Sequence, residues 1–76
     1  MKISDRIRKV RVAYSLTQLD VADKMNISTA VYGKMERNAS HSSFDTLLKI
    51  AAAIGVSLLF LLDTYNKYYK EEKNIL

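Results

Sequence analysis

Apolar residues recur every three or four positions along most of this chain, and this spacing is typical of amphipathic α-helices. Proline is absent and glycine occurs only twice, so the sequence holds few residues that break helices. The pattern therefore predicts an all-α protein without strands. We expect five helices, at about residues 4–14, 18–25, 28–37 and 44–54 and from 58 onward.

Capping residues stand at the starts of these predicted helices. A serine or threonine hydroxyl can accept a hydrogen bond from a backbone N–H group in the first turn of a helix. Residues of this kind occur at the five starts as Ser4, Thr17, Ser28, Ser43 and Ser57. At the other end of the fourth helix, Gly55 suits the left-handed position that ends a helix.

The same spacing predicts which side chains are buried. In the first helix we expect burial of Ile3, Ile7, Val10 and Tyr14. We expect the basic residues on its other faces to be solvated, namely Arg6, Arg8 and Lys9. The second and third helices should bury Val21, Ala22, Met25, Val31, Tyr32 and Met35. The fourth should bury Phe44, Leu47, Leu48, Ile50, Ala51 and Ile54.

The second and third predicted helices are short and are joined by a tight turn at Asn26-Ile27-Ser28. Asparagine tolerates the left-handed backbone that such a turn needs, and Ile27 can fill the corner beneath it. Ala22 is small where the two helices must approach each other. Two helices in this arrangement present the second one to the major groove of DNA. Residues 17–37 therefore predict a helix-turn-helix unit.

Composition narrows the chemistry. A chain of 76 residues predicts a single domain, and the absence of cysteine together with a single histidine argues against disulfides and metal sites. No nucleophile–histidine set and no glycine-rich phosphate loop is present, so we expect neither an enzyme nor a bound cofactor. The N-terminal stretch is charged, and the longest apolar run, residues 58–62, is too short to span a bilayer. We therefore expect a cytoplasmic protein that does not bind membranes.

The net charge of +4 is unevenly distributed. Residues 1–40 carry eight Lys and Arg against four Asp and Glu, whereas residues 41–76 carry four of each. The whole excess therefore lies in the half that contains the predicted helix-turn-helix unit. A basic surface on one part of a small domain is typical of nucleic-acid binding, although a solvated basic helix would produce the same count.

Residues 5–63 resemble the Cro and phage-repressor helix-turn-helix family, also called XRE-like. The motifs that carry the resemblance are, in chain order, Ile7-Arg8-x-x-Arg11, Leu16-Thr17-Gln18, Ala22-Asp23-Lys24-Met25-Asn26-Ile27-Ser28, Glu36-Arg37-Asn38, Phe44-x-Thr46-Leu47-Leu48-Lys49-Ile50-Ala51 and Ile54-Gly55-Val56-Ser57-Leu58. Each motif is weak alone, but together they stand in the family's order and spacing. The resemblance implies a compact five-helix, lambda-repressor-like DNA-binding domain over residues 1–62, encoded by a bacterium or a phage.

The resemblance also implies which residues contact double-stranded DNA. The expected base-reading residues are Ser28, Thr29, Ala30, Gly33 and Lys34. The expected phosphate contacts are Arg11, Gln18, Arg37, Asn38 and Ser40. Family members pair the residues at Arg11 and Glu36, which predicts an ion pair between the first and third helices. The loop over residues 39–43 lacks the basic residues common in the family, which should weaken binding and flatten its salt dependence.

The predicted fifth helix departs from the family because residues 58–62 are apolar on every side. Apolar residues then continue at roughly heptad spacing towards the C-terminus. We expect a helical extension over residues 63–76 and an isologous dimer through Leu58, Leu59, Phe60, Leu62, Tyr65 and Tyr69. These side chains could instead fold back onto the domain's own core.

Two functions fit these observations. The first is a dimeric, sequence-specific transcriptional regulator, either a repressor or an autoregulator, that reads a palindromic operator. The second is a protein-interaction module, of the antitoxin or anti-repressor kind, that keeps the fold, binds DNA weakly and uses its apolar tail to capture a protein partner. The few hydrogen-bonding groups on the third helix favour the second function, and the basic residues of the first and third helices favour the first.

Overall fold

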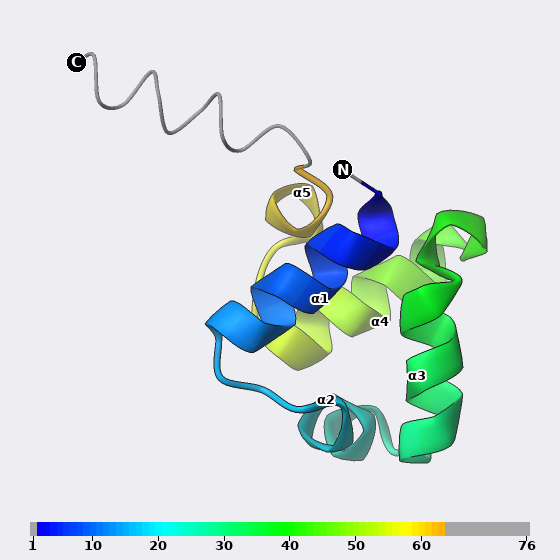
Figure 1. Ribbon diagram of the computed structural model, residues 1–76. Helices are drawn as coiled ribbons and strands as arrows, with labels where there is room; N and C mark the ends of the chain where they lie inside the picture. Colours follow the sequence, from blue (N-terminus) through cyan, green and yellow to red (C-terminus); the bar gives the residue numbers. More distant parts are fainter. Residues whose placement is uncertain (1, 64–76) are drawn as a thin grey trace.

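The computed structural model describes residues 2–63, and Figure 1 shows that part as helices joined by short turns. The elements are α1 (Ile3–Ala13), α2 (Gln18–Met25), α3 (Thr29–Arg37), the 3-10 turn η1 (Ala39–His41), α4 (Phe44–Ile54) and α5 (Leu58–Leu61). The predicted all-α class and its five helices are confirmed. The predicted extension over residues 63–76 lies, except for Asp63, outside the described residues. Along residues 2–63, no helix has both the length and the apolar character needed to cross a bilayer.

Four of the five predicted N-caps are confirmed. In each, the hydroxyl accepts a hydrogen bond from the backbone N–H three residues later, and the caps are Thr17, Ser28, Ser43 and Ser57. The prediction for Ser4 is wrong. The helix begins one residue earlier, at Ile3, and its N-cap residue Lys2 makes no side-chain capping bond. The predicted C-cap Gly55 is confirmed, with a left-handed φ of 97°.

The core draws on every helix. Its largest fully buried side chains are Ile7, Val21, Tyr32, Ile50 and Leu61, one from each of α1 to α5. Burial of apolar surface is the main favourable term in folding, so each helix depends on the others for its stability. Packed against α4 and α1, helices α2 and α3 lie at one end of the molecule, while α5 lies at the opposite end (Figure 1).

Some predicted core residues are exposed instead. Tyr14, Val31, Phe44 and Leu48 were expected to be buried, yet all four are 40% exposed or more. The physical reason is that each helix buries only a stripe. Tyr14 lies beyond the last turn of α1, and Val31 lies beside the buried Tyr32 on the outer face of α3. Phe44 and Leu48, one turn apart, share the outer face of α4.

Arg6 was expected to be solvated, and this prediction is also wrong. Its side chain is only 5% exposed, and its Nη2 donates a hydrogen bond to the backbone oxygen of Phe60 over 2.8 Å. The guanidinium carbon lies 4.7 Å from the centre of the Phe60 ring, a cation–π distance. The apolar stem of arginine packs well between helices. Arg6 therefore joins α1 to α5, although its buried Nε has no hydrogen-bond partner within the described part.

Candidate nucleic-acid interface

The turn between α2 and α3 determines how α3 is presented. Asn26 adopts the left-handed conformation, with φ 58° and ψ 43°, as the sequence predicts. The next N–H, from Ile27, donates to the backbone oxygen of the fully buried Ala22 over 3.0 Å. Ser28 then caps α3. This turn leaves the first residues of α3, Thr29 and Ala30, exposed to solvent.

A buried ion pair connects α1 to the far end of α3, which confirms the pairing expected for Arg11 and Glu36. Arg11 Nε donates to Glu36 Oε2 over 2.8 Å, and Arg11 Nη2 donates to Glu36 Oε1 over 3.1 Å. Arg11 Nη1 also donates to the backbone oxygen of Leu16 over 2.8 Å. The guanidinium thus fixes the end of α1, the loop between α1 and α2, and α3 in one geometry.

The Glu36 carboxylate has two further donors. The Tyr32 hydroxyl donates to Oε2 over 2.7 Å, and Gln18 Nε2 donates to Oε1 over 3.3 Å. Gln18 is the first residue of α2, so a single carboxylate holds together α1, α2 and α3. Fully satisfied buried networks of this kind rigidify the elements they connect.

The network also shifts the acid–base properties of its members. Burial by itself would raise the pKa of the Glu36 carboxyl, but the hydrogen bonds from Arg11 and Tyr32 outweigh it and hold that pKa below its ordinary value. Burial, followed by the hydrogen bond to Glu36, raises the pKa of the Tyr32 hydroxyl. The hydrogen bond to Glu36 raises the pKa of Arg11. The carboxylate and the guanidinium are therefore both charged at neutral pH.

The predicted base-reading residues divide into two groups. The exposed ones are Ser28, Thr29, Ala30 and Lys34. Gly33 differs because it is buried. A Cβ at Gly33 would lie 3.4 Å from Arg37 Nη1 and 3.5 Å from Gln18 Oε1, so the glycine lies beneath these two side chains rather than at the exposed surface.

The predicted phosphate contacts also divide. Arg37, Asn38 and Ser40 are exposed at the end of α3 and in η1, and Gln18 is half-buried beside them. Arg11 is buried, and its Nε, Nη1 and Nη2 all bind protein acceptors. Its geometry is that of a residue that positions α3.

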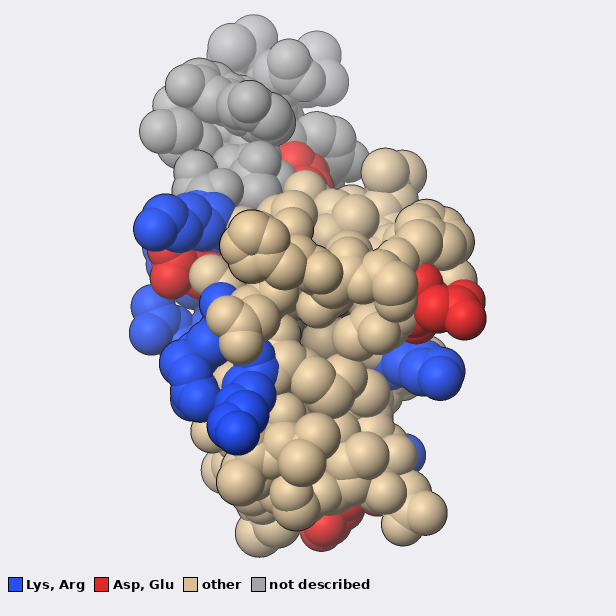
Figure 2. Space-filling view, turned by 90° about the vertical axis from the view of Figure 1, so that its right-hand side faces the viewer, with Lys and Arg blue, Asp and Glu red and all other residues tan. Residues whose placement is uncertain are grey.

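Arg8 also lies on this surface, although the family motifs did not indicate it as a DNA contact. Arg8, Gln18 and Arg37 line a hollow of about 440 Å³ between α1, α2 and α3. Among the described residues, the Arg8 side chain makes one ion pair, an exposed contact of 3.4 Å with Asp5. Figure 2 shows a cluster of Lys and Arg side chains along one side of the molecule, with fewer on the other side. Only the packing of α1 against α3 brings Arg8 and Arg37 together, so no local pattern could reveal it.

The predicted dimerisation residues lie at the opposite end of the molecule. Leu59 is 84% exposed and Phe60 is 43% exposed, whereas Leu58 and Leu62 are partly buried against the core. Tyr65 and Tyr69 lie outside the described residues. Leu58 and Leu62 therefore fold back partly onto the domain's own core, whereas Leu59 stays exposed.

Comparison with known proteins places the same segment in a known family. A helix-turn-helix family model matches residues 7–61, which is well over half of the chain. The immunity repressor protein of Bacillus phage phi105 is 33% identical over 58 residues, covering 76% of this chain and 40% of that protein. No solved structure matches the chain significantly.

Two further curated relatives are similar. The cryptic phage CTXphi transcriptional repressor RstR of Vibrio cholerae is 36% identical over 58 residues, covering 76% of this chain and 52% of that protein. The uncharacterized HTH-type transcriptional regulator YqaE of Bacillus subtilis is 31% identical over 71 residues, covering 91% of this chain and 61% of that protein. The chain thus spans between two fifths and about three fifths of these relatives. The chain belongs to the XRE-like helix-turn-helix family of transcriptional regulators, as its motifs indicate.

Proposed function

We propose that this domain binds double-stranded DNA through α3 and acts as a transcriptional repressor or autoregulator. One observation carries the proposal. The outer face of α3 is exposed, while its inner face is held rigidly because Glu36 binds Arg11 of α1 and Gln18 of α2. A helix that reads base edges must be both accessible and fixed in orientation. Two of the three relatives named above are described as repressors, which supports the direction of regulation.

In this proposal, base reading rests on the exposed residues at the start and middle of α3. Lys34 donates to guanine O6 and N7, and Thr29 donates to a base edge or offers its methyl group. Ala30 makes apolar contact with a thymine methyl, and Ser28 lies at the edge of the groove. The buried Gly33 makes no base contact. Because so few groups can form hydrogen bonds to bases, the shape and deformability of the DNA supply part of the specificity.

The phosphate contacts are Gln18, Arg37, Asn38 and Ser40, and Arg8 joins them. They surround the end of α3 on the side where Arg8 and Arg37 share a hollow. Contacts to phosphate fix the orientation of the protein on the duplex without reading sequence. Arg11 acts behind them by holding Glu36, which in turn orients Gln18.

The active species is a homodimer formed through α5. The exposed Leu59 and Phe60 support this assembly, since an isologous interface would remove both from water. Two copies related by a two-fold axis would read the two halves of a palindrome, with half-site centres about 34 Å apart. One copy alone has few base contacts and would bind weakly.

The experiment that tests the proposal is selection of bound sequences from a random duplex library at low and moderate salt. Recovery of a palindromic motif would support a dimeric, sequence-specific regulator. Recovery of a single half-site would support DNA reading without the dimer. Enrichment of no motif, with weak binding that salt abolishes, would contradict sequence-specific regulation and favour the protein-interaction function.

A further inference from the structure

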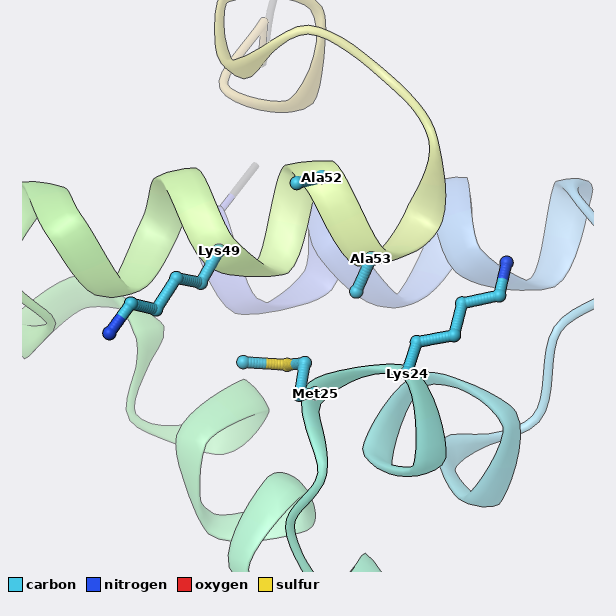
Figure 3. Close-up of a pocket in the computed structure, with 5 residues that line it drawn as sticks. All are labelled: Lys24, Met25, Lys49, Ala52 and Ala53. Carbon is cyan, nitrogen blue, oxygen red and sulfur yellow. The ribbon is translucent and has the colours of Figure 1, made fainter.

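A shallow groove runs between the end of α2 and the second half of α4, away from the proposed DNA surface. Its cavity of about 330 Å³ is lined by Lys24, Met25, Lys49, Ala52 and Ala53 (Figure 3). Met25 extends from the end of α2 and faces the two alanines on α4, so the three side chains give the groove an apolar floor. Small side chains on α4 leave this space open, since larger ones would meet Met25. None of the five residues belongs to the proposed DNA contacts.

Two lysines give the groove its charge. Both are exposed, and Figure 3 shows their side chains directed to opposite ends of the groove. Along residues 2–63, neither ammonium makes an ion pair, and no acidic residue lines the cavity. The aliphatic stem of lysine adds apolar wall while its ammonium stays in water. The groove is therefore apolar at its floor and positively charged at both ends.

The apolar floor continues along α4. Phe44, Leu48 and Ala52 follow one another at intervals of four residues, so they share one face of the helix. All three are exposed, Phe44 by 66% of its surface and Leu48 by 40%. The exposed face of α4 is thus an apolar stripe that leads into the groove. Contiguous exposed apolar surface with a charged rim is typical of a protein-interaction site.

We propose that this groove is a docking site for an acidic, amphipathic segment of another protein. An apolar side chain of the segment lies on Met25, Ala52 and Ala53, and carboxylates on either side bind Lys24 and Lys49. Further apolar side chains continue along Leu48 and Phe44. Spacing of anchors at one-turn intervals fits a helix laid along α4. The proposal is independent of the proposed DNA binding.

The chemistry of the groove favours such a segment over other occupants. A small molecule would need several convergent polar groups to orient it, and the side chains here offer only two ammonium groups at the ends. A second copy would have to supply an acidic apolar segment, and within residues 2–63 its apolar helix α5 (Leu58–Leu61) contains no carboxylate. Charge complementarity therefore selects a partner that carries glutamate or aspartate beside its apolar anchors.

The test uses the full chain and a fluorescein-labelled helical peptide that carries leucines at intervals of four residues, flanked by glutamates. We expect saturable binding by fluorescence anisotropy and amide shifts confined to the end of α2 and to α4. Lys24→Glu with Lys49→Glu should weaken binding by about tenfold or more, because two attractions become repulsions. The matched control, Lys2→Glu with Lys9→Glu, makes the same charge change at the exposed N-cap residue of α1 and at an exposed residue within that helix. It should alter binding by less than about twofold.

A second variant tests the apolar floor. Ala52 is exposed, so Ala52→Gln fills the groove without disturbing the core, and it should also weaken peptide binding. Equal loss of affinity in the two lysine pairs, or amide shifts on α3 or α5, would overturn the proposal. So would a change in oligomeric state of the Lys24 and Lys49 variant, which would make a second copy the occupant. If that variant lost DNA affinity to the same extent, the lysines would belong to the nucleic-acid surface. Failure of the wild-type protein to bind DNA would leave the peptide result unaffected.

Discussion

The Arg11 guanidinium and the Glu36 carboxylate meet at two points inside the domain, with Nε–Oε2 and Nη2–Oε1 distances of 2.8 and 3.1 Å. Twenty-five positions separate the two residues along the chain. Because Tyr32 and Gln18 donate to the same carboxylate, this pair controls the orientation of α3 relative to α1 and α2. The stability of the domain and the geometry of its proposed reading helix therefore depend on the same atoms.

Breaking this pair should be costly. Removing one partner of a buried ion pair leaves the other charge uncompensated, which typically costs about 3–5 kcal/mol. We expect Glu36→Gln to lower the free energy of unfolding by about that amount, as measured by urea denaturation followed by circular dichroism. Asp5→Asn breaks the exposed pair with Arg8 and serves as the control, with an expected loss of at most about 1 kcal/mol. If the single variant does not fold, Arg11→Met with Glu36→Leu should restore folding. A loss for Glu36→Gln no larger than that for Asp5→Asn would contradict the argument.

Acid should destabilise the protein through the same carboxylate. The pKa of Glu36 in the folded state is lower than its ordinary value of 4.5. The stability that the ionised group contributes is therefore fully present above pH 4.5, and it is lost as the pH falls through the lower folded-state pKa. Asp20, whose pKa is lowered chiefly by the hydrogen bond that the Thr17 backbone N–H donates to its carboxylate, acts in the same direction. Urea midpoints measured across this acid range should fall less steeply for Glu36→Gln than for the wild type. Parallel curves would show that Glu36 is not responsible.

Alkaline pH should act on Tyr32. Its pKa in the folded state is above the ordinary value of 10.0, because the hydroxyl is buried and donates to Glu36. The resulting stability is fully present below pH 10 and is lost as the pH rises beyond that value. We expect Tyr32→Phe to be less stable at neutral pH, by about 1–3 kcal/mol, since Glu36 loses a donor. The same variant should lose less stability than the wild type between neutral and alkaline pH. Tyr14→Phe removes the hydroxyl of an exposed tyrosine and is the control at neutral pH, where its loss of stability should be small.

The role of Lys34 can be distinguished from that of Arg37. If Lys34 reads guanine, Lys34→Ala should weaken binding to the selected operator by about 1–3 kcal/mol and relax specificity at one position. Arg37→Ala should weaken binding to all sequences similarly and reduce the steepness of the salt dependence, because Arg37 is proposed to contact a phosphate. Fluorescence anisotropy with operator and scrambled duplexes measures both effects. A uniform loss for Lys34→Ala would instead make it a phosphate contact.

The dimer proposal predicts the effect of a single charge on α5. Leu59 is 84% exposed, so Leu59→Glu should leave the fold intact while placing a carboxylate in the interface. Analytical ultracentrifugation should show a dimer for the wild type and a monomer for Leu59→Glu, which should also lose cooperative operator binding. Phe60 is less suitable, because its ring and backbone oxygen contact Arg6. Val12→Glu changes another exposed apolar residue and is the control. An unchanged dimer for Leu59→Glu would exclude α5 as the interface.

Local chemistry determined most of what the sequence predicts correctly. Hydroxyl groups cap α2, α3, α4 and α5, and each binds a backbone N–H only three residues away. The left-handed residues Asn26 and Gly55 likewise end the helix that directly precedes them. Their effects are readable without knowledge of the fold, because a cap or a turn depends on nearby backbone. The pairing of Arg11 with Glu36 was predicted as well, although only the resemblance to the family indicated it.

The tertiary structure alone decided which residues at the edges of the helix faces are buried and which are exposed. Arg6 and Arg8 are both basic residues of α1, yet Arg6 is buried against Phe60 and Arg8 lies open beside Arg37. Gly33 on α3 is buried beneath Gln18, and Phe44 on α4 lies in water. Helical periodicity identifies an apolar stripe, but it contains no information about which neighbouring helix covers the residues at its edges. The sequence by itself therefore determined the helices, four of their five N-caps and the family. The packing of α1 against α3 and α5 decided which side chains form the proposed surfaces, because those contacts join residues far apart in the chain.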